Sequence, residues 1–316
     1  MSFSEKTKNE LARVIPESRC CQLAELAGLV RMDGTILIST NNQIGLELNT
    51  ENAAVARKVL KLAKLVFNVE TEIRVKRKNR LKKNNIYLIR IPPHNKVREI
   101  LNTLGIAQEG LLINPQVSAI VTKKKCCRRS YIRGVFLGAG SVNDPENAYH
   151  LEIITSSLEY AESLVNLIGK FDLEPKISFR KNWYVVYLKE SEQIVTFLNI
   201  IEAHTALLNF ESTRIQKDLR NKVNRLVNCE TANLNKTINA AFRQKESIEL
   251  IASTLGLRQL PPALRQVAEL RLEHPDISLK ELGEMMEPKL GKSGINHRIR
   301  KLEKLADSIR SQSQKK

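Results

Sequence analysis

Two pairs of adjacent cysteines carry the most reactive side chains of this sequence. Cys20-Cys21 and Cys126-Cys127 lie 106 positions apart in a chain of 316 residues that has five cysteines in all. Thiolates bind zinc, but zinc ligands within one segment are usually separated by two to four residues. Adjacent cysteines therefore predict small buried side chains at the start of two helices, and no metal site. The odd number of cysteines fits a reducing compartment.

Two glycines follow each cysteine pair at the same distances. Gly28 and Gly34 in the first copy correspond to Gly134 and Gly140 in the second, again with an offset of 106 residues. Four coincidences without a gap indicate an internal duplication. Two units of this length predict one domain with pseudo-two-fold symmetry.

The segments around these residues predict the same order of helices and strands in both copies. Apolar residues recur at three- and four-residue steps in the segments predicted as helices. Short apolar runs next to turn residues predict the strands. The predicted fold class is α+β, with two αββαββα-like repeats at about 18–106 and 124–205 inside a domain of residues 1–213. The predicted segments are helices 4–13, 53–67 and 96–104 with hairpins 35–48 and 73–91, then helices 129–138, 157–170 and 190–201 with strands 149–155, 176–180 and 183–189.

The stretch Leu26–Gly34 resembles the motif of the LAGLIDADG homing endonucleases. That resemblance implies two motif helices that pack closely through Gly28 and Gly134, because a glycine lets backbones approach. It also implies one metal-binding acid before the last glycine of each motif. Asp33 stands there in the first copy but Ala139 in the second, so we expect the fold without cleavage, with Asp33 as a vestigial, solvated or helix-capping acid and no bound metal.

Basic residues dominate the tip of the hairpin at 73–91. The chain has a formal net charge of +17, which favours a polyanionic partner, nucleic acid before a membrane surface. Runs of charge are usually solvated loops, but like charges this dense repel one another without a counter-ion, so we predict phosphate contacts. The residues are Arg74, Lys76, Arg77, Lys78, Arg80, Lys82 and Lys83.

A linking helix is predicted over 214–250, since the region from Glu211 to Phe242 lacks proline and glycine. Asparagines recur along one face of it although asparagine is a poor helix former. They could read adenine edges or phosphates, or the stripe could dock onto the first domain; both readings remain open. The stripe is Asn221, Asn224, Asn228, Asn235 and Asn239, and the further predicted DNA contacts are Arg214, Lys217 and Arg225.

The segment 251–316 predicts an all-α helix-turn-helix domain that resembles region 4 of sigma factors. Ser278-Leu279-Lys280-Glu281 has the pattern of a capping box, and Ser293 could cap a third helix with Ile295 and Ile299 inward. A recognition helix presents base-reading and phosphate-binding side chains along one face. Within about 276–309 the predicted contacts are Ser278, Lys292, Ser293, Asn296, His297, Arg298, Arg300, Lys301 and Lys304.

With both parts in view, the chain resembles the WhiA family of bacterial regulators, in particular over Asn224–Lys236 and Leu279–Arg300. The resemblance implies control of sporulation, cell division or chromosome segregation, double-stranded DNA and a protein co-regulator as partners, and no enzyme activity or cofactor. The alternatives are an active endonuclease and an RNA maturase of the same ancestry. No apolar run approaches the roughly 20 residues that cross a membrane, so we expect a cytoplasmic, nucleoid-associated protein and no membrane partner.

Overall fold

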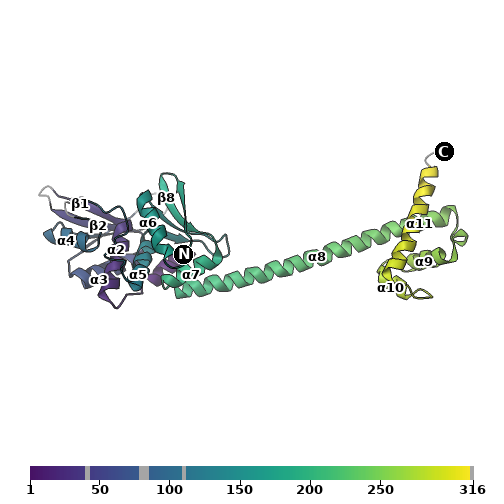
Figure 1. Cartoon of the computed structure of the whole chain (residues 1–316), viewed down its shortest axis with the longest axis horizontal. Helices are drawn as coiled ribbons and strands as arrows, with labels where there is room; N and C mark the ends of the chain where they lie inside the picture. Colours follow the sequence, from purple (N-terminus) through teal and green to yellow (C-terminus); the bar gives the residue numbers. More distant parts are fainter. Residues whose placement is uncertain (40–42, 78–84, 109–111, 314–316) are drawn as a thin grey trace. The chain divides into compact units, whose positions relative to one another are not determined.

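The computed structural model describes residues 1–39, 43–77, 85–108 and 112–313. The chain forms two compact units, Met1–Asp218 and Leu219–Lys316 (Figure 1). Among the described residues, no helix has the length and apolar character that crossing a membrane requires.

The first unit is built from two copies of one arrangement. In each copy a long helix precedes a four-stranded antiparallel sheet, with strand order β1-β2-β4-β3 in the first and β5-β6-β8-β7 in the second. The identical order confirms the predicted duplication and the α+β class. After α1 (Phe3–Leu11), the first copy has α2 (Arg19–Asp33), β1 (Gly34–Ile38), β2 (Ile44–Thr50), α3 (Ala53–Phe67), β3 (Glu72–Arg77), β4 (Asn85–Ile91) and α4 (Asn95–Thr103). The second copy has α5 (Lys125–Ala139), β5 (Gly140–Val142), β6 (Leu151–Thr155), α6 (Leu158–Gly169), β7 (Lys176–Arg180), β8 (Trp183–Leu188) and α7 (Ser191–Ile200).

The start of the second copy differs from the prediction. Helix α5 begins at Lys125, four residues before the predicted start, and the short strand β5 was not predicted. The residue before α5 is Lys124, whose side chain makes no capping hydrogen bond. The sequence therefore carries no capping signal at that point. A strand of three residues is also too short to show an alternating pattern.

Each sheet turns one face toward the helices of its own copy. In the register of β2 and β4, Leu46 pairs with Ile91 and Leu48 pairs with Ile89, and all four side chains are buried against α2 and α3. Burying one such side chain contributes about 1.5–3 kcal/mol. Because successive side chains alternate across a strand, the residues between these four point to the opposite face of the sheet.

Helices α2 and α5 lie side by side at the centre of the unit and contact each other through glycine (Figure 1). A Cβ atom added at Gly28 would lie 2.5 Å from the carbonyl oxygen of Tyr131, and one added at Gly134 would overlap the carbonyl of Glu25. The prediction that these two glycines allow close backbone packing is confirmed.

A buried ion cluster joins the two copies beside this glycine contact. Glu25 of α2 accepts hydrogen bonds from Arg133 of α5, at 3.0 Å from Nε and 2.9 Å from Nη2, and forms an ion pair with Lys58 of α3. The remaining Arg133 nitrogen, Nη1, donates to Glu202 at 2.6 Å. Burial lowers the pKa of Lys58 to about 8, although Glu25 opposes the shift. Glu25 is therefore the central counter-ion of two buried cations.

Helix α8 (His204–Thr254) begins in the first unit and continues into the second. It is longer at both ends than the predicted linking helix at 214–250. The carboxylate of Glu10 in α1 accepts hydrogen bonds from the backbone amides of Thr205 (2.6 Å) and Ala206 (3.0 Å), which caps its first turn. That cap comes from a residue almost 200 positions away, so no local pattern could mark the start of α8.

The second unit contains the remainder of α8 and three further helices. They are α9 (Pro262–Glu273), α10 (Leu279–Glu284) and α11 (Lys292–Ser313), with a short 3₁₀ turn at Leu257–Gln259. Their apolar faces form a separate core, which includes Val267 of α9, Leu282 of α10 and Ile295 and Ile299 of α11. The predicted helix-turn-helix architecture is confirmed.

Candidate nucleic-acid interface

Helix α11 has one apolar face and one polar face. Ile295, Ile299 and Leu302 are buried against α9 and α10. The opposite face starts near the helix N-terminus and continues at three- and four-residue steps through His297 and Arg300. The exposed polar side chains of this face are Lys292, Ser293, His297, Arg300, Lys301 and Lys304.

Three residues of the predicted contact set have other roles or positions in this unit. Ser293 lies inside the first turn, because α11 already begins at Lys292, so the prediction that Ser293 caps the helix is wrong. Asn296 and Arg298 are half-buried, and Arg298 donates a hydrogen bond to the carbonyl of Ala263 at 3.3 Å. Arg298 therefore ties α11 to the start of α9.

Ser278 forms the predicted capping box at the start of α10. Its hydroxyl accepts a hydrogen bond from the amide of Glu281 at 3.3 Å, and the Glu281 carboxylate accepts one from the amide of Ser278 at 2.8 Å. These bonds lower the pKa of Glu281. Since the Ser278 hydroxyl is already engaged, its local role is to fix the start of α10.

A groove beside the helix-turn-helix brings the predicted contact Lys292 together with two lysines that were not predicted. It has a volume of 330 Å³ and is lined by Lys236 of α8, Lys280 of α10 and Lys292 of α11. Arg271 of α9 lines the same groove; its Nη1 donates to three backbone carbonyls, while its buried Nε has no partner among the described residues. Lys236 and Lys280 come from helices outside the predicted recognition helix, and only the folded unit brings them together.

The basic hairpin of the first unit places its charges on the sheet face that points away from the helices. Arg74 lies opposite Leu88 in the register of β3 and β4, on the face that α2 and α3 do not cover, and Lys76 follows two residues later. All six residues of β3 are exposed, and Arg74 forms an exposed ion pair with Glu72 at 3.3 Å. Arg77 ends the strand, and the other predicted contacts, Lys78, Arg80, Lys82 and Lys83, lie outside the described residues.

The predicted contacts on α8 divide into two groups. Arg214 forms an ion pair with Glu211 at 3.0 Å. Lys217 donates to the carbonyls of Pro145 (3.1 Å) and Asn147 (2.8 Å), and its ammonium group lies over the Tyr149 ring in a cation–π contact. Their charges are engaged within the first unit. Further along, the side chains are exposed without a break from residue 219 to residue 239. These exposed residues include Asn221, Asn224, Arg225, Asn228, Asn235 and Asn239.

The C-terminal ends of α2 and α5 hold one acid where the nucleases carry two. Asp33 ends α2 and Ala139 ends α5. Lys8 of α1 reaches the same place and donates to the carbonyl of Gly138 at 3.3 Å, in a cavity of 470 Å³ that Asp33 also lines. Burial raises the pKa of Asp33 to about 6, although the Lys8 charge opposes the shift. The acid is thus half-buried beside an ammonium group, and the prediction of a solvated or helix-capping aspartate is wrong.

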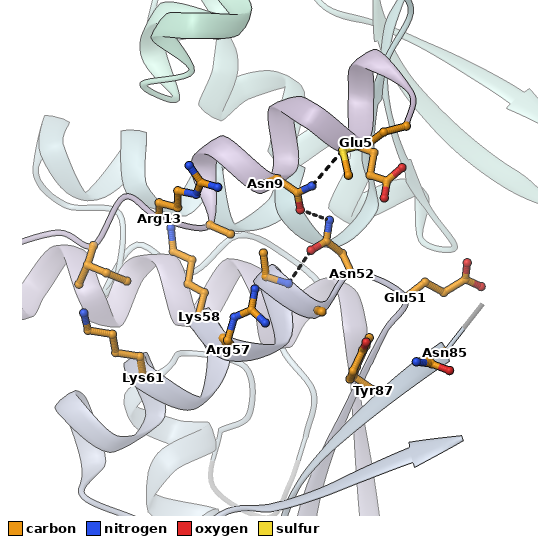
Figure 2. Close-up of a pocket in the computed structure, with 15 residues that line it drawn as sticks. Glu5, Asn9, Arg13, Glu51, Asn52, Arg57, Lys58, Lys61, Asn85 and Tyr87 are labelled. Carbon is orange, nitrogen blue, oxygen red and sulfur yellow. Dashed lines mark hydrogen bonds between the residues drawn. The ribbon is translucent and has the colours of Figure 1, made fainter. Parts of the chain in front are cut away.

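A larger hollow of 790 Å³ lies between α1, α3 and β4 (Figure 2). Asn9 and Asn52 are hydrogen-bonded across it at 2.8 Å, and Asn52 also caps α3. Exposed basic side chains, among them Arg57 and Lys61, line one side of the hollow, and Glu5 and Glu51 line the other. This mixed lining lacks the single sign of charge that a phosphate site needs.

The fold and its surfaces define a class of protein, in which a duplicated LAGLIDADG-like domain is joined to a helix-turn-helix domain. The chain belongs to the WhiA family. The profile of the WhiA N-terminal LAGLIDADG-like domain matches residues 19–107, that of the WhiA LAGLIDADG-like domain matches residues 128–220, and that of the WhiA C-terminal HTH domain matches residues 223–306.

Full-length relatives agree with this assignment. The chain is 55% identical over 312 residues to the "Probable cell division protein WhiA" of Desulforamulus reducens. This alignment covers 98% of this chain and 97% of the relative. It is 56% identical over 315 residues to the protein of the same name from Desulfitobacterium hafniense, with 100% and 98% covered. The crystal structure of full-length DUF199/WhiA from Thermatoga maritima matches with a TM-score of 0.61 at 27% identity, covering 98% of this chain and 99% of that one.

Proposed function

We propose that this chain binds double-stranded DNA as a regulator of cell division and does not cleave it. Helix α11 enters the major groove with Ser293, His297 and Arg300 toward base edges. Lys301 and Lys304 contact the flanking phosphates. The single observation that carries this proposal is the exposed polar face of α11 above a buried apolar face.

The groove beside the helix-turn-helix adds phosphate contacts. Lys236, Lys280 and Lys292 come from three helices of the second unit and line one hollow. A cluster of positively charged lysines favours contact with a backbone phosphate, and such a contact carries no sequence information. Arg74 and Lys76 on the exposed strand β3 supply a second, sequence-independent contact in the first unit.

The end of the motif helices supports binding without cleavage. Activating water for phosphodiester hydrolysis requires divalent metal held by carboxylates at this place. With Ala139 in place of the second acid and Lys8 beside Asp33, a positive charge occupies the surroundings that a metal ion would need. The names of the relatives support cell division as the process; control of transcription, chromosome segregation or sporulation genes is the finer form of the proposal.

The replacement of Arg300 by alanine tests direct reading of DNA. We expect Arg300→Ala to weaken binding to a preferred duplex by about 1–3 kcal/mol, and to weaken binding to a scrambled duplex much less. The measurement is a fluorescence-anisotropy titration of the full chain at fixed salt, with a preferred site taken from genome-wide immunoprecipitation. Arg310→Ala is the matched control, because it removes the same charge from the last turns of α11, where Arg310 pairs with Asp307 at 3.2 Å.

Two outcomes would contradict this proposal. An equal loss on both duplexes would make Arg300 a phosphate contact rather than a base contact. Tighter binding of structured intron RNA than of duplex DNA in the same titration would favour an RNA maturase.

A further inference from the structure

The two cysteine pairs meet at the N-terminal ends of the motif helices. Cys20 and Cys21 lie in the first turn of α2, and Cys126 and Cys127 lie in the first turn of α5. All four Sγ atoms lie within 4.8 Å of one another, and those of Cys126 and Cys127 are 4.0 Å apart. Cys20 and Cys126 are exposed, so the prediction that all four are buried packing residues is wrong.

This separation fits a single tetrahedral metal ion. An ion with bonds of about 2.3 Å to four sulfur atoms separates those atoms by about 3.8 Å, so inward movements of less than about 1 Å would close the site. A disulfide requires about 2.05 Å between the sulfur atoms, and all five cysteines of the chain are free. An iron–sulfur cluster binds its thiolates on separate iron atoms and needs a wider set of ligands.

The spacing of the cysteines in the sequence describes one segment at a time. The rule of two to four residues between ligands describes two ligands that one turn delivers to the same ion. Here each copy of the duplication supplies an adjacent pair, and the pseudo-two-fold relation of α2 and α5 brings the pairs together. The four ligands are thus two equivalent sets, one from each copy.

Positively charged groups lie close to the four cysteines. The N-terminal ends of two helices carry partial positive charge, which opposes the burial that raises the pKa of the Cys21 and Cys127 thiols. Three exposed lysines, Lys123, Lys124 and Lys125, precede or begin α5. The hydroxyl of Ser18 lies 3.8 Å from the sulfur of Cys21, as a donor to a ligand would. Four thiolates around a divalent cation would carry a net charge of −2, which these groups offset.

We propose that Cys20, Cys21, Cys126 and Cys127 together bind one Zn²⁺ ion that joins the two copies of the duplicated domain. Binding converts four thiols and one Zn²⁺ into a tetrathiolate complex and releases the thiol protons to solvent. A site closed by four protein ligands has no open position for water or substrate, so the ion is structural and not catalytic. It holds the first turns of α2 and α5 together, at the end opposite to Asp33.

Metal content of the purified full chain tests the proposal. We expect one Zn²⁺ per chain by elemental analysis after growth with added zinc, and loss of that zinc in Cys20→Ser and Cys126→Ser. Both replacements affect exposed side chains, and Trp183 fluorescence and circular dichroism check that the first unit remains folded. Cys229→Ser is the matched control, because Cys229 is an exposed cysteine on α8 far from the four in sequence, and it should keep the zinc.

Cobalt distinguishes the ligand set. Chain that has been stripped of metal and given Co²⁺ should develop the visible bands of a tetrahedral tetrathiolate complex, with loss of the bands in Cys20→Ser but not in Cys229→Ser. Zinc should also raise the unfolding midpoint of the stripped chain. The proposal is overturned by folded wild-type chain that binds neither ion while its thiols are reduced, by mass spectra that show disulfides between the pairs, or by iron and sulfide in the purified protein.

Discussion

The two ends of the α2/α5 helix pair differ in whether the two copies carry the same residues there. At the N-terminal end both copies carry the same residues, and the sulfur atoms of Cys20, Cys21, Cys126 and Cys127 lie within 4.8 Å of one another. At the C-terminal end Asp33 stands in one copy and Ala139 in the other, with Lys8 from outside the repeat beside them. The first end therefore offers the four equivalent thiols of the proposed zinc site, whereas the second end offers one carboxylate.

The two ends are separated by a middle that is itself asymmetric. Gly28 and Gly134 are equivalent, yet Glu25 and Arg133 are not related by the duplication and form one ion pair between the helices. Variants that disturb this middle test whether the ends depend on each other. The single tryptophan, Trp183, lies in the first unit, so its fluorescence reports the unfolding of that unit alone.

The largest effect is expected for Glu25→Gln. The replacement leaves Arg133 and Lys58 buried without their central counter-ion, and removing one partner of a buried ion pair costs about 3–5 kcal/mol. Urea unfolding followed by Trp183 fluorescence measures the loss. Glu202→Gln is the control, because the Glu202 side chain is 36% exposed and water can replace part of the interaction. Equal losses in the two variants would contradict the central role of Glu25.

A smaller effect is expected for alanine at the glycine contact. Gly28→Ala and Gly134→Ala each introduce a methyl group against the backbone of the partner helix, and overpacking of this kind costs about 1–3 kcal/mol. Gly169→Ala at the end of α6 is the control, because an added Cβ would meet nothing within 4 Å there. If the helix pair sets the geometry of both ends, Gly28→Ala and Gly134→Ala should also bind zinc less tightly than Gly169→Ala. An unchanged free energy of unfolding in Gly28→Ala and Gly134→Ala would mean that the helices do not pack as closely as described.

The smallest effect is expected at Asp33. Because burial raises the pKa of Asp33 from its ordinary value near 3.8 to about 6, the folded chain binds this proton more tightly than the unfolded chain. The free energy of unfolding should therefore decrease as the pH rises from about 4 to about 6, and Asp33→Asn should remove that part of the decrease, about 1 kcal/mol or somewhat more. Unfolding curves at pH 4.5 and 7 measure it, with Glu17→Gln as an exposed control. A decrease of the same size in Asp33→Asn would assign the pH dependence to other groups.

Local sequence patterns predicted much of this structure because much of it is determined locally. Helix α3 has the predicted bounds, since Asn52 caps its first turn and its apolar residues recur regularly. The capping box at Ser278 and the two buried glycines were predicted for the same kind of reason. Each of these features depends on a few neighbouring residues or on the duplication itself.

The features that sequence analysis missed all depend on residues far apart in the chain. The cysteine cluster needs two first turns from different copies. Lys8 reaches Asp33 only because α1 packs across the ends of the motif helices, and Glu10 caps α8 from the same helix. The groove cations Lys236 and Lys280 come from two helices. Residue type alone did not distinguish these residues from the many other surface lysines and acids of a strongly basic chain.

The most direct test of DNA binding without cleavage is to incubate supercoiled plasmid with saturating chain and Mg²⁺ or Mn²⁺. We predict that the plasmid is bound, which a mobility shift would show, and that it remains supercoiled after the protein is removed. Metal-dependent nicking by the wild-type chain that disappears in Asp33→Ala would contradict it, because the C-terminal end of the helix pair would then still assemble a working metal site.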